Sequence, residues 1–132
     1  MVGKKVLVVD DEIHIVHVIA IKLRNNGYEV ITSDNGREAY DLACKERPDV
    51  VIADYQMPGM TGLELAEKLR TQEQTRQTPL ILLTARTFVL PEEQRQRLKI
   101  PECISKPFSP RELLMTVEGI LFGSRLGVNQ EI

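Results

Sequence analysis

The sequence lacks the marks of several large classes of protein. Its formal net charge is only −2 and its isoelectric point is about 5.7, so no basic balance points to nucleic acid or to an anionic membrane surface. No apolar run approaches the roughly 20 residues of a membrane-spanning helix. Internal repeats, low-complexity segments and interdomain linkers are absent as well. These absences leave an ordinary soluble domain, and 132 residues are enough for one core.

Cysteine is scarce, and we expect no secretion signal. The two cysteines, Cys44 and Cys103, lie far apart and form no CxxC motif, so we expect free thiols rather than a disulfide. The first residues, MVGKKVLVVDDE, reach acidic residues after four consecutive apolar ones. Such a run is too short for the core of a signal peptide, and we therefore expect a cytoplasmic protein.

The sequence does contain a regular alternation of short apolar runs with longer stretches of helical spacing. The runs are unbroken and rich in β-branched residues, as in strands that are covered on both faces. Repeated alternation of strand and helix predicts an α/β domain with a parallel sheet between two layers of helices. The predicted strands are 5–9, 30–33, 50–53, 80–83 and 103–105, and the predicted helices are about 12–26, 35–47, 62–76, 87–98 and 109–122.

The polar residues that follow these strands define a candidate site, because ligands of an open parallel sheet bind outside the carboxyl ends of its strands. The residues there are Asp10, Asp11, Asp54, Thr84 and Lys106. Two like charges about 4 Å apart repel by roughly 4 kcal/mol at an effective dielectric constant of about 20. The lysine offsets one carboxylate and a divalent cation would cancel the remainder. An all-oxygen set of ligands suits Mg²⁺.

Each of these residues also has a purely structural interpretation. The two adjacent aspartates could form an acidic cluster that complements a helix dipole, and for this pair alone the two interpretations weigh about equally. Asp54 could be a turn residue, Thr84 could merely end a strand, and Lys106 could be a solvated surface lysine. Their joint position directly after buried runs favours a functional site.

Four segments of the chain resemble the successive signatures of the receiver (CheY-like) domain of two-component response regulators. They are VLVVDDE, VIADYQMPGMTGLEL, LILLTA and ISKPF, in this order within residues 4–122. Together they are highly specific. The resemblance implies a flavodoxin-like, doubly wound sheet of five parallel strands in order 2-1-3-4-5, flanked by five helices. It assigns a receiver domain to 1–122 and leaves a tail, 123–132, that we expect to be mobile.

The resemblance also implies roles for the acidic residues. Asp54 would accept a phosphoryl group from a sensor histidine kinase or a histidine phosphotransfer protein. Asp11 and Asp54 would bind Mg²⁺ through their side chains and Gln56 through its backbone carbonyl, with Asp10 acting directly or through water. Phosphoryl transfer chiefly needs positioning and neutralisation of charge, which a metal ion and a lysine supply.

The remaining roles concern the switch. By the same resemblance Thr84 would contact the phosphoryl group, Lys106 would pair with a phosphoryl oxygen, and Pro107 would follow a cis peptide bond. We expect a phosphorelay switch that catalyses only its own phosphorylation and dephosphorylation, not a turnover enzyme. We expect no direct nucleic-acid or membrane binding by this chain. A homodimer through the fourth helix, fifth strand and fifth helix is left open.

The sequence departs from the family pattern near the fifth strand. Three residues before the lysine the family usually has tyrosine or phenylalanine, whereas Cys103 stands here. We therefore expect weaker coupling between the site and the surface formed by the fourth helix, fifth strand and fifth helix. Gln56 and Arg86, two positions after Asp54 and Thr84, flank the expected phosphoryl site and could gate water. Arg86 could equally be a solvated side chain.

The first predicted helix carries several surface features. Glu12 should point away from the aspartates on the first turn. His14 and His17 could share a metal ion, but no third ligand is placed, so an exposed helix face is favoured. The helix has more apolar surface than one buried stripe requires. The part nearest the acids could dock helices of a partner.

Two other functions remain open. One is a phosphorylation-independent interaction module on the same fold, which Cys103 favours and the complete acid, threonine and lysine set opposes. The other is a Mg²⁺ phosphatase of another α/β family. That class would want an Asp-x-Asp pair, whereas Asp54 is followed by Tyr55 and Gln56. No GxGxxG or P-loop segment supports nucleotide binding.

Overall fold

The computed structural model describes residues 3–85 and 88–123, and within these ranges five parallel strands alternate with five helices. The sheet order is β2-β1-β3-β4-β5, as the resemblance implies. The strands are β1 (Lys5–Val9), β2 (Glu29–Ser33), β3 (Val50–Asp54), β4 (Leu80–Thr84) and β5 (Glu102–Ser105). The helices are α1 (Ile13–Arg24), α2 (Gly36–Glu46), α3 (Gly62–Leu69), α4 (Glu92–Leu98) and α5 (Pro110–Phe122). Among the described residues, no helix has both the length and the apolar character needed to cross a bilayer.

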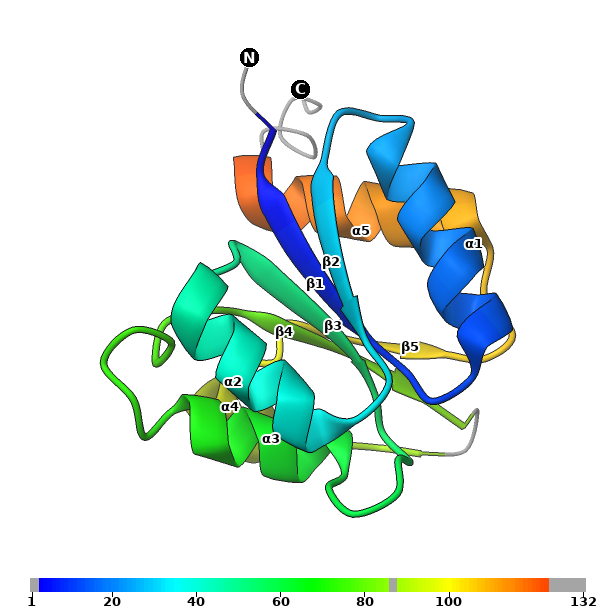
Figure 1. Cartoon of the computed structure of the whole chain (residues 1–132). Helices are drawn as coiled ribbons and strands as arrows, with labels where there is room; N and C mark the ends of the chain where they lie inside the picture. Colours follow the sequence, from blue (N-terminus) through cyan, green and yellow to red (C-terminus); the bar gives the residue numbers. More distant parts are fainter. Residues whose placement is uncertain (1–2, 86–87, 124–132) are drawn as a thin grey trace.

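Helices cover both faces of the sheet, which explains why the apolar runs are unbroken. Figure 1 shows α1 and α5 on one face and α2, α3 and α4 on the other. Side chains alternate between two cores, so Val6 and Val8 pack toward α1 and α5, whereas Leu7 and Val9 pack toward the other three helices. We call these the α1–α5 side and the α2–α3–α4 side of the sheet.

Side-chain caps fix where three of the helices begin. Asn35 accepts a hydrogen bond from the backbone N–H of Glu38 at the start of α2. Thr61 and Glu64 form a reciprocal capping box at the start of α3. Ser109 caps α5. These caps satisfy N–H groups that lack partners within the helix, and they set the lengths of the loops at the carboxyl edge of the sheet.

Two helices are shorter than the sequence pattern predicts. The third ends at Leu69 rather than near residue 76, because the guanidinium of Arg70 binds backbone carbonyls of the following segment and holds that segment in turns. The fourth begins at Glu92 rather than near residue 87. Pro91 precedes it, and a proline disfavours helical backbone in the residue before it. The tail predicted over 123–132 lies, after Gly123, outside the described residues.

Candidate functional site

Three charged side chains, those of Asp10, Asp54 and Lys106, meet at the carboxyl edge because all three point to the same side of the sheet. The residues before Asp10 and Asp54 face the α2–α3–α4 side, so strand alternation turns both aspartates to the α1–α5 side. Lys106 comes two residues after Ile104, which packs on the α1–α5 side, and it turns the same way. Its Nζ lies 2.8 Å from Asp54 Oδ1 and 3.2 Å from Asp10 Oδ2.

The electrostatics of this cluster are set by burial and by one lysine. Asp10 is fully buried and Asp54 is 7% exposed. Burial raises the pKa of both carboxyl groups, and the hydrogen bonds and charge of Lys106 oppose that rise. Burial alone would lower the pKa of Lys106, but the hydrogen bonds and charges of Asp54 and Asp10 outweigh burial and raise that pKa to about 12. The lysine therefore stays protonated at neutral pH.

The cluster offers oxygen ligands to a cation. Asp10, Asp11 and Asp54 each present a carboxylate oxygen, and these three atoms lie within 4.8 Å of one another. A cavity of about 450 Å³ opens beside them, and its lining includes Asp11, Asp54, Gln56 and Lys106. A hard divalent cation prefers such donors. The structure therefore brings together the three carboxylates predicted for the metal, and Gln56 lines the cavity beside them.

Thr84 occupies a different position from the other predicted residues. It ends β4 and is 3% exposed. Leu83 before it packs on the α1–α5 side, so the side chain of Thr84 turns to the α2–α3–α4 side, opposite Asp54. Its backbone carbonyl accepts a hydrogen bond of 2.8 Å from the N–H of Lys106. Thr84 is thus joined to the site through the backbone of Lys106. The predicted gate residue Arg86 lies outside the described residues.

The expectation that Glu12 points away from the site is wrong. Its Oε1 lies 3.4 Å from Lys106 Nζ, and Glu12 lines the same cavity as Asp54. Glu12 is the N-cap residue of α1 and has extended backbone, with φ −95° and ψ 106°. It therefore precedes the first helical turn and does not follow the rotation of the helix. The ammonium group across the edge gives its side chain a partner.

The segment around β5 has the features expected from the sequence. The Lys106–Pro107 peptide bond is cis, and both cysteines are free. Cys103 pairs with Leu82 in the sheet and is half-buried against the core on the α2–α3–α4 side. Burial raises the pKa of its thiol. A small, protonated side chain thus stands where the family usually has an aromatic ring.

An aromatic contact that the sequence did not reveal lies next to Asp54. The rings of Tyr55 and Phe88 lie with their centroids 4.7 Å apart and their planes tilted by 34°. Tyr55 also lines the cavity of the site. The pair links the loop after β3 to the loop after β4. Its only trace in the sequence is an aromatic residue directly after the acidic one, which alone predicts no contact.

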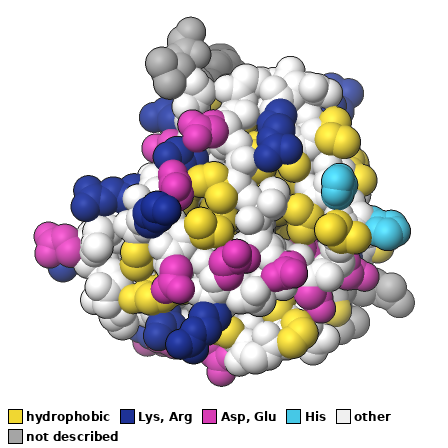
Figure 2. All heavy atoms as spheres, in the orientation of Figure 1, with side chains coloured by type: hydrophobic (Ala, Val, Ile, Leu, Met, Phe, Trp, Pro, Cys, Tyr) yellow, Lys and Arg dark blue, Asp and Glu magenta, His cyan; other side chains and the backbone are white. Residues whose placement is uncertain are grey.

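The exposed face of α1 is apolar beside the site. Ile13, Val18 and Ile21 are 64%, 47% and 57% exposed, and His14 and His17 are exposed on the same helix, as expected. Figure 2 shows the two histidines at one edge of the molecule with hydrophobic side chains beside them. This face is available to a partner.

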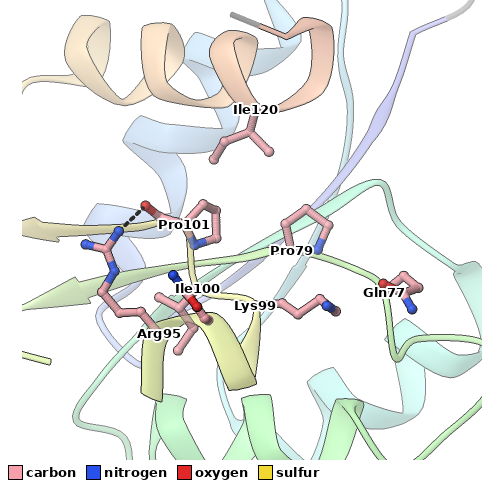
Figure 3. Close-up of a pocket in the computed structure, with 8 residues that line it drawn as sticks. Gln77, Pro79, Arg95, Lys99, Ile100, Pro101 and Ile120 are labelled. Carbon is pink, nitrogen blue, oxygen red and sulfur yellow. Dashed lines mark hydrogen bonds between the residues drawn. The ribbon is translucent and has the colours of Figure 1, made fainter. Parts of the chain in front are cut away.

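A second hollow lies at the opposite edge of the sheet, away from the acids. It has a volume of about 520 Å³, and its walls come from the segments before β4 and β5 and from α4 and α5 (Figure 3). Arg95 lines it and donates a hydrogen bond of 3.1 Å to the carbonyl of Pro101. Because it lies at the amino ends of the strands, it is separate from the candidate site.

Comparison with known sequences gives one consistent family. The model of the response regulator receiver domain matches residues 6–118. The phosphate regulon transcriptional regulatory protein PhoB of Pseudomonas aeruginosa is 38% identical over 121 residues, 92% of this chain and 53% of the relative. The alkaline phosphatase synthesis transcriptional regulatory protein PhoP of Bacillus subtilis is 37% identical over 124 residues, 94% of this chain and 51% of the relative. The chain spans about half the length of these curated relatives.

Solved structures agree in fold. The chemotaxis response regulator CheY4 of Vibrio cholerae superimposes with a TM-score of 0.82 at 39% identity, over 90% of this chain and 99% of that one. The receiver domain of a sensor histidine kinase from Pseudomonas aeruginosa gives a TM-score of 0.80 at 28% identity, over 92% and 99%. That structure has a magnesium ion coordinated in its active-site cleft.

Proposed function

We propose, from the premise that this chain belongs to the response regulator receiver domain family, that it accepts a phosphoryl group on Asp54. The donor would be a sensor histidine kinase or a histidine phosphotransfer protein. The observation that carries the proposal is the contact of 2.8 Å between Lys106 Nζ and Asp54 Oδ1 at the wall of an open cavity. A carboxylate, a cation and room for a phosphoryl group occur together there.

The geometry favours Asp54 over its neighbours as the acceptor. Asp10 is fully buried, and its two oxygens already accept hydrogen bonds from the N–H of Glu12 and from Lys106. Asp11 is exposed. The carboxylates that form ion pairs with Lys106 within the described residues are those of Asp10, Glu12 and Asp54. Asp54 combines access to the cavity with a cation beside it. A phosphoryl group attached there would bring its charge next to Lys106.

In the proposed reaction an oxygen of Asp54 attacks the phosphorus atom while the bond from phosphorus to the donor nitrogen breaks, and the nitrogen keeps the electron pair. Lys106 then exchanges its contact with the Asp54 carboxylate for a phosphoryl oxygen. Asp11, Asp54, the carbonyl of Gln56 and, directly or through water, Asp10 would hold Mg²⁺, which when bound neutralises charge on the carboxylates and the phosphoryl oxygens. Attack of water on the same phosphorus would break its bond to the Asp54 oxygen, release inorganic phosphate and restore the carboxylate, so the chain would catalyse only its own phosphorylation and dephosphorylation.

The partner would approach over α1. Its exposed residues Ile13, Val18 and Ile21 are large and apolar, and a small hollow between α1 and the start of α5 is lined by His14, Lys106 and neighbouring residues. Apolar surface next to a charged site suits helices of a protein donor. A docked donor would bring its phosphohistidine to the mouth of the cavity.

We predict that weak Mg²⁺ binding depends on Asp11 more than on Glu12. Asp11 belongs to the group of three carboxylates with mutually close oxygens, whereas Glu12 pairs with Lys106. Loss of a carboxylate that holds the ion should weaken binding at least as much as loss of a residue that merely orients a ligand, which costs about 10- to 100-fold. Titrations of Mg²⁺ into Asp11→Asn and Glu12→Gln would measure this, and equal losses in both would show that the acidic residues act only as diffuse charge.

We predict that Cys103→Tyr strengthens the response to phosphorylation. Taking a two-state equilibrium from 1:99 to 99:1 needs about 5.5 kcal/mol of differential stabilisation, and burial of an aromatic ring contributes about 1.5–3 kcal/mol. Cys103 is too small to supply that part. Backbone NMR shifts over residues 88–108, with and without a beryllofluoride phosphoryl mimic, should therefore be modest in the wild type. Large, uniform shifts in the wild type, no greater in Cys103→Tyr, would contradict the argument.

Cys103 also bears on the second candidate function, a phosphorylation-independent interaction module. Cys103 is the observation that favours it, because the usual aromatic part of the switch is missing. If Asp54 takes no label while the domain still binds a partner through α1, the interaction module becomes the better account.

A further inference from the structure

Glu12 adds a fourth carboxylate to the mouth of the cavity that holds Asp54. Its Oε1 lies 3.4 Å from Lys106 Nζ, and its side chain is 62% exposed. The other two partners of Lys106 are far more enclosed, with side-chain exposures of 0% for Asp10 and 10% for Asp54. Glu12 is therefore the outermost of the three carboxylates that share this ammonium group.

The charges around the cavity are unbalanced toward the acidic side. Asp10, Glu12 and Asp54 all contact Lys106, and Asp11 lines the same cavity. One ammonium group offsets only one of these carboxylates. Glu12 also neutralises part of the positive charge of Lys106, so that the ammonium group attracts an incoming phosphoryl group less strongly. Its charge therefore opposes the approach of an anion twice, by repulsion and by competition for the lysine.

We propose that Glu12 is a specificity-determining residue that disfavours small, highly charged phosphoryl donors relative to less charged ones. The inference rests on the proposed phosphorylation of Asp54. Repulsion by a fixed charge grows with the charge of the approaching group. Glu12 therefore restrains transfer from free acyl phosphates, while a protein donor docked on α1 overcomes the same barrier through its contact surface.

Two small donors separate this effect from a general change in reactivity. Acetyl phosphate is a dianion; its P–O bond breaks as the Asp54 oxygen bonds to phosphorus, and acetate leaves with the electron pair. Phosphoramidate carries one net negative charge, because its nitrogen is already protonated. Its P–N bond breaks and ammonia leaves. The ratio of the two rates cancels changes in the nucleophile and isolates the sensitivity to donor charge.

The test compares the wild type with Glu12→Gln in both donors, at a Mg²⁺ concentration that saturates each protein. The ratio of the acetyl phosphate rate to the phosphoramidate rate should rise about threefold in Glu12→Gln at low salt and less at high salt, because salt screens exposed charges. Folding should be unaffected, since the side chain of Glu12 makes no capping hydrogen bond to α1.

The matched control is Glu73→Gln, which removes the same charge from an exposed residue in the segment before β4, at the opposite edge of the sheet. Its ratio should equal that of the wild type. An unchanged ratio in Glu12→Gln, or an equal rise in both variants, would overturn the role of Glu12 and leave phosphorylation intact. Failure of the wild type to take label from either donor would overturn the proposed function as well.

Discussion

Replacement of Asp54 by asparagine is expected to abolish phosphoryl incorporation, with a loss of roughly 100-fold or more. The amide of asparagine is not a nucleophile toward phosphorus. Asp10 cannot take over, because it is fully buried with both oxygens hydrogen-bonded. Intact-mass measurement after incubation with phosphoramidate and Mg²⁺ would show one added phosphoryl group on the wild type and none on Asp54→Asn.

The control for this experiment is Asp34→Asn. Asp34 is an exposed acid in the loop after β2, and it lines a neighbouring hollow together with Asp10 and Asp11. The substitution removes a carboxylate that lies near the site but does not line the cavity of Asp54, so labelling should persist. Full-strength labelling of Asp54→Asn would show that another group is the acceptor, and the assignment of Asp54 would have to be withdrawn.

Replacement of Arg70 by methionine is expected to destabilise the fold by about 3–5 kcal/mol, a large share of the roughly 5–15 kcal/mol of a typical domain. The guanidinium donates to the carbonyls of Leu98, Thr75 and Arg76, at 2.8, 2.9 and 2.9 Å, and also to that of Thr78. Burial lowers its pKa to about 10, so it remains charged at neutral pH. Methionine would keep the apolar stem and leave these carbonyls without their donor.

Urea denaturation of three variants would measure the effect. Arg70→Lys should recover less than half of the loss, because one ammonium group cannot reach carbonyls that a planar guanidinium serves from three nitrogens. Arg97→Met is the control. Arg97 is an exposed arginine whose contacts with Glu67 are 3.4 Å long, so its loss should cost under about 0.5 kcal/mol. A similarly small cost for Arg70→Met would show that water replaces the guanidinium.

The fold was largely predictable from the sequence because the three central strands, β1, β3 and β4, each contain an apolar run of four residues with a polar residue directly after it. That pattern gave the strands and the edge where Asp10, Asp54 and Lys106 meet. The strand order came from the resemblance rather than from the pattern. The ends of α3 and α4 were not predictable to the same degree. Arg70 binds backbone carbonyls, which every residue carries, so its partners leave no trace in the sequence.

The site shows the same limit. That three carboxylates and a lysine gather at one edge follows from which residues end the strands. The side chain of Glu12 could not be placed, because its direction depends on a cation that lies 94 positions away in the chain. The side of the sheet to which Thr84 points could be predicted, because side chains alternate along β4. The contact of Tyr55 with Phe88 depends on how two loops pack.

The alternation of side chains in the sheet also limits which changes of length the chain can tolerate. Asp10, Asp54 and Lys106 share one side only because each lies a fixed number of residues after the last buried positions of β1, β3 and β5. Deletion or insertion of one residue within any of these strands would carry the charged group to the opposite side. Loops at the amino edge carry no such constraint. Insertions and deletions should therefore be tolerated better at that edge, outside the segment that Arg70 binds before β4, than within these strands.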